Sequence, residues 1–407
     1  MSYTFNNEVK YADSANLDAF GRLRTSNVTS LLEYKHTHDK LPLIVSEVTA
    51  GTATSVYDSP NSQVIMSVAT NNDLVIRQSK SRGIYQPGKG QMFEASFGNF
   101  QLETNVIKRV GYFTSTTGSP YNSLFDGFFL ESNGQTNKIS FQLWKSGTTI
   151  VSATTDTWLT TDYDPTNIDW SKVQLMQVDF QWLGVGRVRF GMVFDGIYRE
   201  FVTNTAANNL TTVYMKYPNQ PVRYEVRSLG VGATGSFNMI CAQVSLEGTI
   251  NSLQKSSSIV AFTAQTKPTA LVTYPILGYR INPIYDGVNI TLSDIQSLNV
   301  TSPSKADFVM SVNYNPTLSS SSTWVTIPNT PIQYALSTGQ TITNEGHVIA
   351  SFLGSGSGTQ VDAFEFKDNI LRPGINVDGT LDEIWICVKG TLGNQDYRTS
   401  INLSYFE

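Results

Sequence analysis

The chain has 407 residues, of which 40% are hydrophobic and only 15% are charged, and its formal net charge is −5. This apolar content is enough for one or two large cores, which excludes wholesale disorder. No overall basic surplus exists to displace counterions from phosphates, so we expect no nucleic-acid partner.

Cysteine and histidine are both scarce. Cys241 and Cys387 lie far apart in the sequence, which excludes a disulfide-stapled scaffold and a cysteine-based zinc site. We expect no metal and no cofactor. No stretch approaches the roughly 18 apolar residues of a membrane span, and the first residues lack the pattern of a secretory signal. We therefore expect synthesis in a cytoplasm and no membrane insertion.

In chain order, the sequence predicts an extended arm over residues 1–30, a β-sandwich over 31–250, a linker over 251–258 and a second β-sandwich over 259–407. Alternation of period two, with abundant Thr, Val, Tyr and Phe, favours strands throughout. The linker is small and polar, as linkers are. Asp-Gly pairs, which supply the positive φ angles of tight hairpins, occur at 126–127, 195–196, 286–287 and 378–379.

Residues 173–202 predict a hairpin in detail. One face of the first strand carries Met176, Val178, Phe180 and Trp182, and the second strand repeats the pattern with Val188, Phe190, Met192 and Phe194. Matching the two faces places Phe180 opposite Val188, with Leu183-Gly184-Val185 as the loop. Asp179 then lies opposite Arg189, and Gln181 opposite Arg187. We expect such cross-strand pairs to contribute only about 0.2–1 kcal/mol.

The segment IDWSKVQLMQVDFQWLGVGRVRFGMVFDG (168–196) resembles virion structural proteins of tailed bacteriophages and some large algal viruses. There it belongs to a concanavalin-like jelly-roll domain. LDAFGRLRTS (17–26) resembles the N-terminal arm motif of the same proteins, 85–97 and 108–118 resemble strands leading into the jelly roll, and 313–334 resembles their C-terminal β domain. The resemblance implies a virion location and, as partners, other virion proteins and copies of this chain.

The arm motif suggests an assembly contact. Phe20 and Leu23 are apolar, Arg22 and Arg24 are cationic, and Gly21 allows a bend. A segment this short cannot bury both apolar groups by itself. We expect it to dock on a neighbouring subunit or partner, with the arginines pairing to carboxylates or carbonyls; the alternative is docking on its own jelly roll.

The same resemblance raises an enzyme hypothesis, and the sequence argues against it. Laminarinase-type glycosidases of this fold carry two catalytic Glu residues flanking an Asp on one strand. Gln177-Val178-Asp179-Phe180-Gln181 keeps the Asp but has Gln at both Glu places, so we predict a non-enzymatic protein.

The polar face of the hairpin is a candidate glycan-binding face, with host surface glycans as the ligand. Its members offer planar donors and acceptors, and Trp144, Trp158 or Tyr198 would supply stacking; the alternative is a solvated or subunit-facing surface. The members of the face are Gln177, Asp179, Gln181, Arg187 and Arg189.

Three further clusters have weaker chemical signals. His36-Thr37-His38-Asp39 lacks a third convergent metal ligand and is interpreted as a surface loop. Asp162, Asp164, Asn167 and Asp169 could hold a cation but lack an EF-hand pattern. A loosely basic stretch would meet an acidic partner subunit or be solvated; it comprises Lys80, Arg82, Lys89, Lys108 and Arg109.

Overall fold

The computed structural model describes residues 27–115, 124–160, 163–250, 255–282, 284–285, 288–289, 292–302, 306–354, 364–365 and 371–406. Over these ranges the regular elements are antiparallel strands and three single-turn 3-10 helices, η1 (Ser59–Asn61), η2 (Thr155–Thr157) and η3 (Pro165–Asn167). The all-β class predicted from the alternation is confirmed. No helix in the described part of the chain is both long and apolar enough to cross a membrane.

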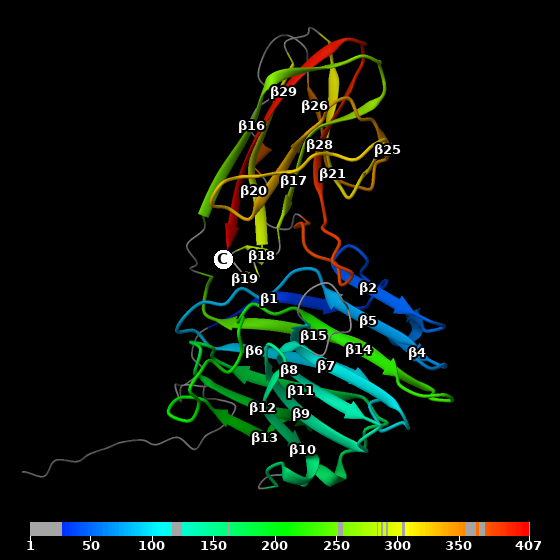
Figure 1. Ribbon diagram of the computed structural model, residues 1–407, viewed down its shortest axis with the longest axis vertical. Coiled ribbons are helices and arrows are strands. Elements are labelled where there is room, and N and C mark those ends of the chain that lie inside the picture. Colours follow the sequence, from blue (N-terminus) through cyan, green and yellow to red (C-terminus); the bar gives the residue numbers. More distant parts are fainter. Residues whose placement is uncertain are drawn as a thin grey trace, which may run out of the picture.

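The first fifteen strands form two sheets, which we call the N-terminal sandwich (Figure 1). The strands are β1 (Val28–Lys35), β2 (Val45–Ala50), β3 (Thr54–Asp58), β4 (Gln63–Val68), β5 (Leu74–Ser79), β6 (Gln91–Gly98), β7 (Val106–Ser115), β8 (Phe125–Asn133), β9 (Lys138–Lys145), β10 (Thr148–Thr154), β11 (Gln174–Phe180), β12 (Arg187–Phe194), β13 (Ile197–Thr205), β14 (Val222–Ser228) and β15 (Gly235–Glu247).

Within the described residues, one sheet of this sandwich has eight strands and the other has seven. The first runs β13-β12-β11-β6-β15-β4-β3, and β1 pairs with β15 beyond the end of β4. The second runs β10-β9-β8-β7-β14-β5-β2. We call them the β11 sheet and the β7 sheet. This is the jelly-roll sandwich expected from the sequence.

The core of the N-terminal sandwich lies between the two sheets and is rich in aromatic rings. Phe93 of β6 packs edge-on against Phe128 of β8 at 5.9 Å, and Phe141 of β9 stacks on Phe190 of β12 at 4.7 Å. All four rings are at most 1% exposed. Alternate residues of each strand therefore face this core, and the residues between them face outward.

The remaining strands form the C-terminal sandwich. They are β16 (Lys255–Lys267), β17 (Thr273–Ile281), β18 (Ile284–Tyr285), β19 (Val288–Asn289), β20 (Leu292–Thr301), β21 (Phe308–Tyr314), β22 (Thr317–Leu318), β23 (Val325–Thr326), β24 (Ile332–Leu336), β25 (Ile342–Asn344), β26 (His347–Gly354), β27 (Phe364–Glu365), β28 (Ile384–Gly390) and β29 (Gln395–Phe406).

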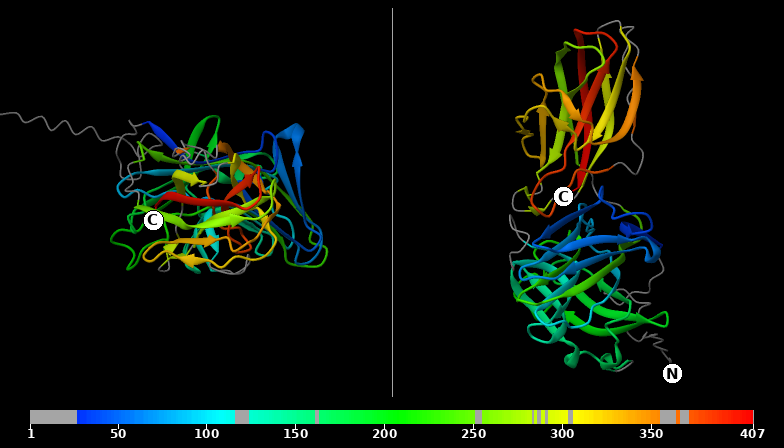
Figure 2. Two further views of the ribbon diagram at one scale, coloured as in Figure 1. Left: turned by 90° about the horizontal axis from the view of Figure 1, so that it is seen from above. Right: turned by 90° about the vertical axis from the view of Figure 1, so that its right-hand side faces the viewer.

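Two main sheets of these strands enclose a second core. In the described part of the chain they run β16-β29-β20-β27 and β23-β24-β17-β28-β21-β26, with the small pairs β18-β19 and β22-β25 beside them. Ile276, Met310 and Leu403 lie in the core between them, each fully buried. The two sandwiches are stacked along the long axis of the molecule (Figure 2).

Two sequence predictions need correction here. The predicted linker ends inside a strand, because residues 255–258 belong to β16 and pair with 402–405 of β29; residues 251–254 lie outside the described ranges. The predicted arm likewise ends in strand, since β1 begins at Val28. The rest of the arm, including Phe20, Gly21, Arg22, Leu23 and Arg24, lies outside the described residues.

The Asp-Gly pairs have different roles. Asp195 and Gly196 both have positive φ and close the hairpin between β12 and β13, as predicted. Asp126-Gly127 instead lies within β8, where a Cβ on Gly127 would sit 2.3 Å from the carbonyl oxygen of Tyr112. That glycine allows close strand approach, so the turn predicted there is wrong. The pair at 286–287 lies outside the described residues.

Candidate functional site

The hairpin of β11 and β12 has the predicted register. Phe180 pairs with Val188 and Asp179 with Arg189. The loop takes its turn at Leu183 and Gly184, which both have positive φ, and the amide of Gln181 donates to the carbonyl oxygen of Arg187 at 3.1 Å. The alternation and the loop length were sufficient to predict this geometry.

The polar face of this hairpin is not the open surface that we expected. Asp179 and Arg189 form an ion pair in which both side chains are at most 2% exposed, and Gln181 is fully buried. Gln177 is 9% exposed and Arg187 is half-buried. The prediction of a glycan-binding face centred on Asp179 is therefore wrong for Asp179, Gln181 and Arg189, because a sugar cannot reach these three side chains.

The buried pair also changes the energetic estimate. A cross-strand pair in water contributes a few tenths of a kcal/mol, whereas removing one partner of a buried pair costs about 3–5 kcal/mol because the other charge is left uncompensated. Asp179 is thus a structural carboxylate held by Arg189. The β11 strand presents no second carboxylate beside it, since Gln177 and Gln181 occupy the flanking positions.

An accessible polar row crosses the same sheet further along. The strand registers place Gln177 opposite Glu94, Glu94 opposite Gln243, and Gln243 opposite Glu33. The four side chains therefore share the outer face of β11, β6, β15 and β1. Glu33 is exposed, and Glu94 and Gln243 are half-buried. We call this set the polar row.

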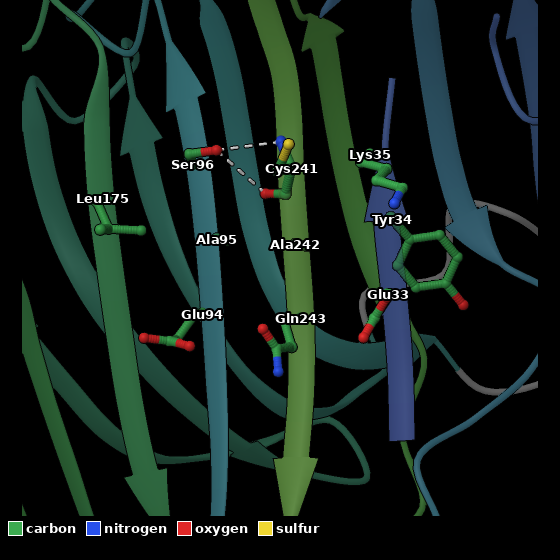
Figure 3. Close-up of a pocket in the computed structure, with 10 residues that line it drawn as sticks. All are labelled: Glu33, Tyr34, Lys35, Glu94, Ala95, Ser96, Leu175, Cys241, Ala242 and Gln243. Carbon is green, nitrogen blue, oxygen red and sulfur yellow. Dashed lines mark hydrogen bonds between the residues drawn. The ribbon is translucent and has the colours of Figure 1, made fainter. Parts of the chain in front are cut away.

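A shallow pocket of about 340 Å³ lies over Glu94, Gln243 and Glu33 of the polar row (Figure 3). A second row lines its other side and consists of Leu175, Ser96, Cys241 and Lys35 in register. Ser96 Oγ accepts a hydrogen bond from the Cys241 amide at 3.1 Å, which fixes the floor between β6 and β15. The pocket thus combines carboxylates, an amide, an ammonium group and one apolar side chain.

The spacing of these groups follows from the sheet. Neighbouring strands lie about 4.8 Å apart, so Glu33 and Glu94, with β15 between their strands, are carried about 9–10 Å apart. Carboxylates accept hydrogen bonds, the Gln243 amide both donates and accepts, and Lys35 donates. A ladder of this kind can bind several hydroxyl groups of one ligand. The ladder is not visible in the sequence, because its members come from four strands spread over residues 33–243.

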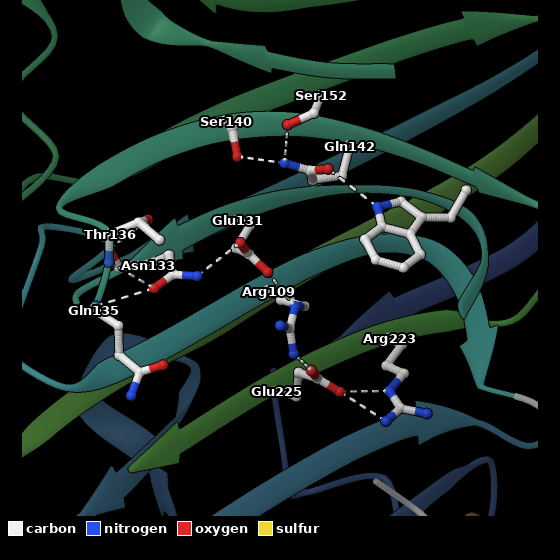
Figure 4. A network of polar contacts seen from close by, with 11 residues as sticks. Arg109, Glu131, Asn133, Gln135, Thr136, Ser140, Gln142, Ser152, Arg223 and Glu225 are labelled. Atoms are coloured by element: carbon white, nitrogen blue, oxygen red, sulfur yellow. Dashed lines mark hydrogen bonds and ion pairs between the residues drawn. The ribbon is translucent and has the colours of Figure 1, made fainter. Parts of the chain in front are cut away.

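The outer face of the β7 sheet carries a different polar network (Figure 4). Arg109 Nε donates to Glu131 at 2.6 Å, Arg109 also contacts Glu225, and Arg223 Nε donates to Glu225 at 2.9 Å. Burial raises the pKa of Glu225, but the charges of Arg223 and Arg109 outweigh it and hold this pKa below its usual value. The network is a set of compensated charges rather than an open site.

Aromatic rings complete this network. The Arg109 guanidinium lies 4.8 Å from the ring centre of Phe125, and that of Arg223 lies 5.3 Å from Phe113. Trp144 donates to Gln142 at 3.0 Å. Trp158, another expected stacking residue, is 4% exposed and stacks on Phe201 inside the core. Trp158 is therefore not presented as a sugar platform, and Trp144 is half-buried.

The basic stretch is also largely buried. Lys108 and Arg82 are at most 7% exposed and Lys80 is 9% exposed, while Arg109 lies in the network above. Lys108 Nζ pairs with Glu103 at 3.0 Å. The expectation of a solvated or partner-facing stretch is therefore wrong for these side chains.

The two metal hypotheses find no donor set. His36 is buried and its Nδ1 lies 2.7 Å from the Ile240 carbonyl oxygen, whereas His38 is exposed. Asp164 and Asp169 each accept hydrogen bonds within their own turns, from Thr166 and Ser171; Asp162 lies outside the described residues. Over the described ranges no three His, Cys, Asp or Glu side chains gather as metal ligands do.

Comparison with known proteins gives similarity at the level of solved structures. No family model matches the chain, and no curated protein matches it. The carbohydrate recognition domain of Emp47p is 12% identical, with a TM-score of 0.36 over 55% of this chain and 97% of that one. Peanut lectin with a nine-residue peptide is 8% identical, with a TM-score of 0.37 over 55% and 100%. The metal-free lumenal domain of VIP36 is 8% identical, with a TM-score of 0.35 over 56% and 100%.

Proposed function

We propose that the protein is a non-enzymatic, glycan-binding adsorption protein of a tailed-phage particle, and that the polar row is its binding face. The observation that carries the proposal is the register itself. Gln177, Glu94, Gln243 and Glu33 lie side by side in register, and the last three line an accessible pocket. The binding face thus moves from the hairpin to the neighbouring strands β6, β15 and β1.

The row does not have the carboxylate spacing of a retaining glycosidase. Retaining glycosidases need two carboxyl groups about 5–5.5 Å apart, and inverting enzymes need a raised-pKa acid facing a base. Gln243 stands between Glu94 and Glu33, so adjacent carboxylates of the retaining type are not formed here. The ligand would be a surface polysaccharide whose hydroxyls bridge the carboxylates, the amide and Lys35.

Two variants test the proposal directly. Gln243→Ala removes the central amide, and Glu33→Gln removes an exposed carboxylate without changing its shape. Each should weaken binding to the retained glycan about 2- to 10-fold, the equivalent of one lost hydrogen bond. Binding is measured first on an array of bacterial envelope glycans and then by calorimetry with the retained glycan. Gln135→Ala and Glu345→Gln, at exposed positions elsewhere, are matched controls.

The outcomes are distinct. Equal binding by all four variants, or no retained glycan on the array, refutes the proposal. Release of reducing ends from host envelope polysaccharide by the purified protein refutes the non-enzymatic part. Mass spectrometry of purified particles tests the virion location, which the resemblance of 168–196 and 17–26 supports.

A second candidate function is assembly of the particle, supported by the LDAFGRLRTS segment. In this function the arm docks on another virion protein or a second copy of this chain. Because β1 begins at Val28, deletion of residues 1–26 removes the arm and spares the sheet. Particles that assemble normally with the deleted chain would refute an assembly role for the arm.

A further inference from the structure

A second pocket, of about 540 Å³, lies between the two sandwiches. One wall comes from β2, β3, β5 and the turn before β2, and includes Ser46, Tyr57 and Arg77. The other wall is the segment before β28, which contributes Asn376, Asp378 and Thr380. This segment descends from the C-terminal sandwich to the edge of β2 (Figure 1). The volume falls within the roughly 300–1,000 Å³ of small-molecule sites, which often form at such junctions.

Direct contacts between the sandwiches hold the two walls together. The Val377 amide donates to Ser46 Oγ at 2.9 Å. Beside the pocket, Lys80 Nζ lies 3.2 Å from Asp382 Oδ1 and donates to Tyr314 Oη at 3.2 Å. Asp382 is fully buried. The pocket is therefore a built feature of the junction and not a gap between two loosely placed bodies.

The cationic groups that line the pocket are already paired. Lys40 Nζ donates to Glu47 Oε1 at 2.6 Å, and Arg77 donates to the other oxygen of the same carboxylate. Lys80 pairs with Asp382. An anionic ligand would have to displace one of these partners, and Arg77 is only 1% exposed. The lining therefore favours a neutral ligand over an anionic one.

The pocket also leaves polar groups unsatisfied. Tyr57 Oη and Arg77 Nε are buried and have no hydrogen-bond partner among the described residues. Buried polar groups are nearly always hydrogen-bonded, so two such atoms beside one pocket are unusual. The Tyr57 ring offers an apolar face, and the carboxylates and hydroxyls around it offer acceptors and donors. A compact ligand that carries several hydroxyls matches this lining.

We propose that the inter-sandwich pocket binds a neutral sugar unit of mono- or disaccharide size, at a site separate from the polar row. A hydroxyl of the sugar supplies the partner that Tyr57 Oη lacks, and Asp378 accepts a hydrogen bond from the opposite wall. Because both sandwiches contribute to the site, an occupied pocket holds segment 371–383 against β2 and β5.

Tyr57→Phe is the sharpest test, because it removes a hydroxyl that makes no hydrogen bond in the unbound protein. Its thermal stability should equal or exceed that of the wild type, and its affinity for the sugar should fall about 2- to 10-fold. Asp378→Asn changes the opposite wall and should also weaken binding. Tyr163→Phe is the matched control, because the Tyr163 ring stacks on Phe194 of β12, far from this pocket.

Binding is measured by saturation-transfer NMR and calorimetry on the full chain, with glucose, galactose, mannose, maltose and lactose as neutral probes and glucuronic acid as the charged one. Hydrogen exchange of segment 371–383 is followed with and without the bound sugar. The inference is supported if a neutral probe binds, if Tyr57→Phe and Asp378→Asn weaken this binding, and if Tyr163→Phe and Glu33→Gln leave it unchanged. Hydrogen exchange of segment 371–383 should also be slower with the sugar bound than without it.

Three results overturn the inference: no neutral probe binds at millimolar concentration, only glucuronic acid binds, or binding is unaffected by Tyr57→Phe and Asp378→Asn. If Glu33→Gln and Gln243→Ala alone weaken binding, the sugar sits on the polar row and the inter-sandwich site is refuted. If only Tyr57→Phe and Asp378→Asn do so, the inference stands, and the polar row is tested separately by the envelope-glycan array.

Discussion

Substitution of Asp382 tests whether one buried ion pair holds the two sandwiches in their relative position. Asp382 is fully buried and accepts from Lys80 Nζ at 3.2 Å, from Asn315 Nδ2 at 2.7 Å and from the Gly374 amide at 3.2 Å. Asp382→Asn removes the negative charge and leaves the Lys80 ammonium with only neutral acceptors, the new amide oxygen and Tyr314 Oη. Loss of one partner from a buried pair costs about 3–5 kcal/mol.

Lys80→Met should cost less than Asp382→Asn. In that variant the carboxylate keeps its neutral donors, Asn315 and the Gly374 amide, so its charge stays partly compensated. The double variant removes both charges and should be less destabilised than the sum of the single variants. The coupling expected from a close buried pair is within about 0.5–3 kcal/mol.

The assay is urea unfolding, combined with hydrogen exchange read on segment 371–383. If the pair holds the junction, Asp382→Asn exposes that segment to exchange at urea concentrations where β11 and β12 are still protected. Additivity of the two single variants within about 0.5 kcal/mol would refute the coupling. Unchanged exchange of the segment in Asp382→Asn would refute the claim that the pair holds the junction.

Three further predictions concern buried charges. Burial lowers the pKa of Lys267 to about 8. Because an unfolded lysine has a pKa near 10.4, the unfolded chain binds more protons between these two values, and stability should rise as pH increases from 8 to 10. Urea midpoints at pH 7.5, 8.5 and 9.5 should show this rise in the wild type and a smaller one in Lys267→Met. Burial raises the pKa of Asp73, but backbone hydrogen bonds from Ala69, Thr70 and Thr52 outweigh it and hold the pKa well below normal. Stability from this group is complete above about pH 4 and is lost as pH falls further, so the urea midpoint of Asp73→Asn should depend less on pH below 4 than that of the wild type. Asp179→Ala should destabilise the protein by about 3–5 kcal/mol, and a urea midpoint equal to that of the wild type would contradict the buried pair with Arg189.

The local geometry of the fold was predictable where short-range patterns decide it. The register of β11 and β12 follows from the alternation around Phe180 and Val188 and from a loop with one suitable glycine, and all of this lies within about twenty residues. The turn at Asp195-Gly196 follows for the same reason. Such features depend on neighbours in the sequence, so alternation and turn chemistry are enough to specify them.

The errors arise where distant parts of the chain meet. Asp126-Gly127 has the sequence of a turn, but the Asp126 carboxylate accepts from the amides of Lys216 and Tyr217, ninety residues away. Alternation places Asp179 on the outer face of its strand and cannot tell whether that face is covered. The members of the polar row are separated by up to 210 positions, and only the order β11-β6-β15-β1 brings them together.

The location of the buried charges decides how any loss-of-function experiment on this chain must be interpreted. Asp179 and Arg189 are conspicuous polar residues, yet their removal acts through folding, so lost adsorption in Asp179→Ala would say nothing about a glycan. Gln243 and Glu33 lie on an accessible surface, and Glu33 in particular has little packing to lose. A variant of either that keeps the wild-type urea midpoint and loses adsorption isolates recognition from stability. Measuring both quantities on Asp179→Ala and Gln243→Ala therefore separates the scaffold from the proposed binding face.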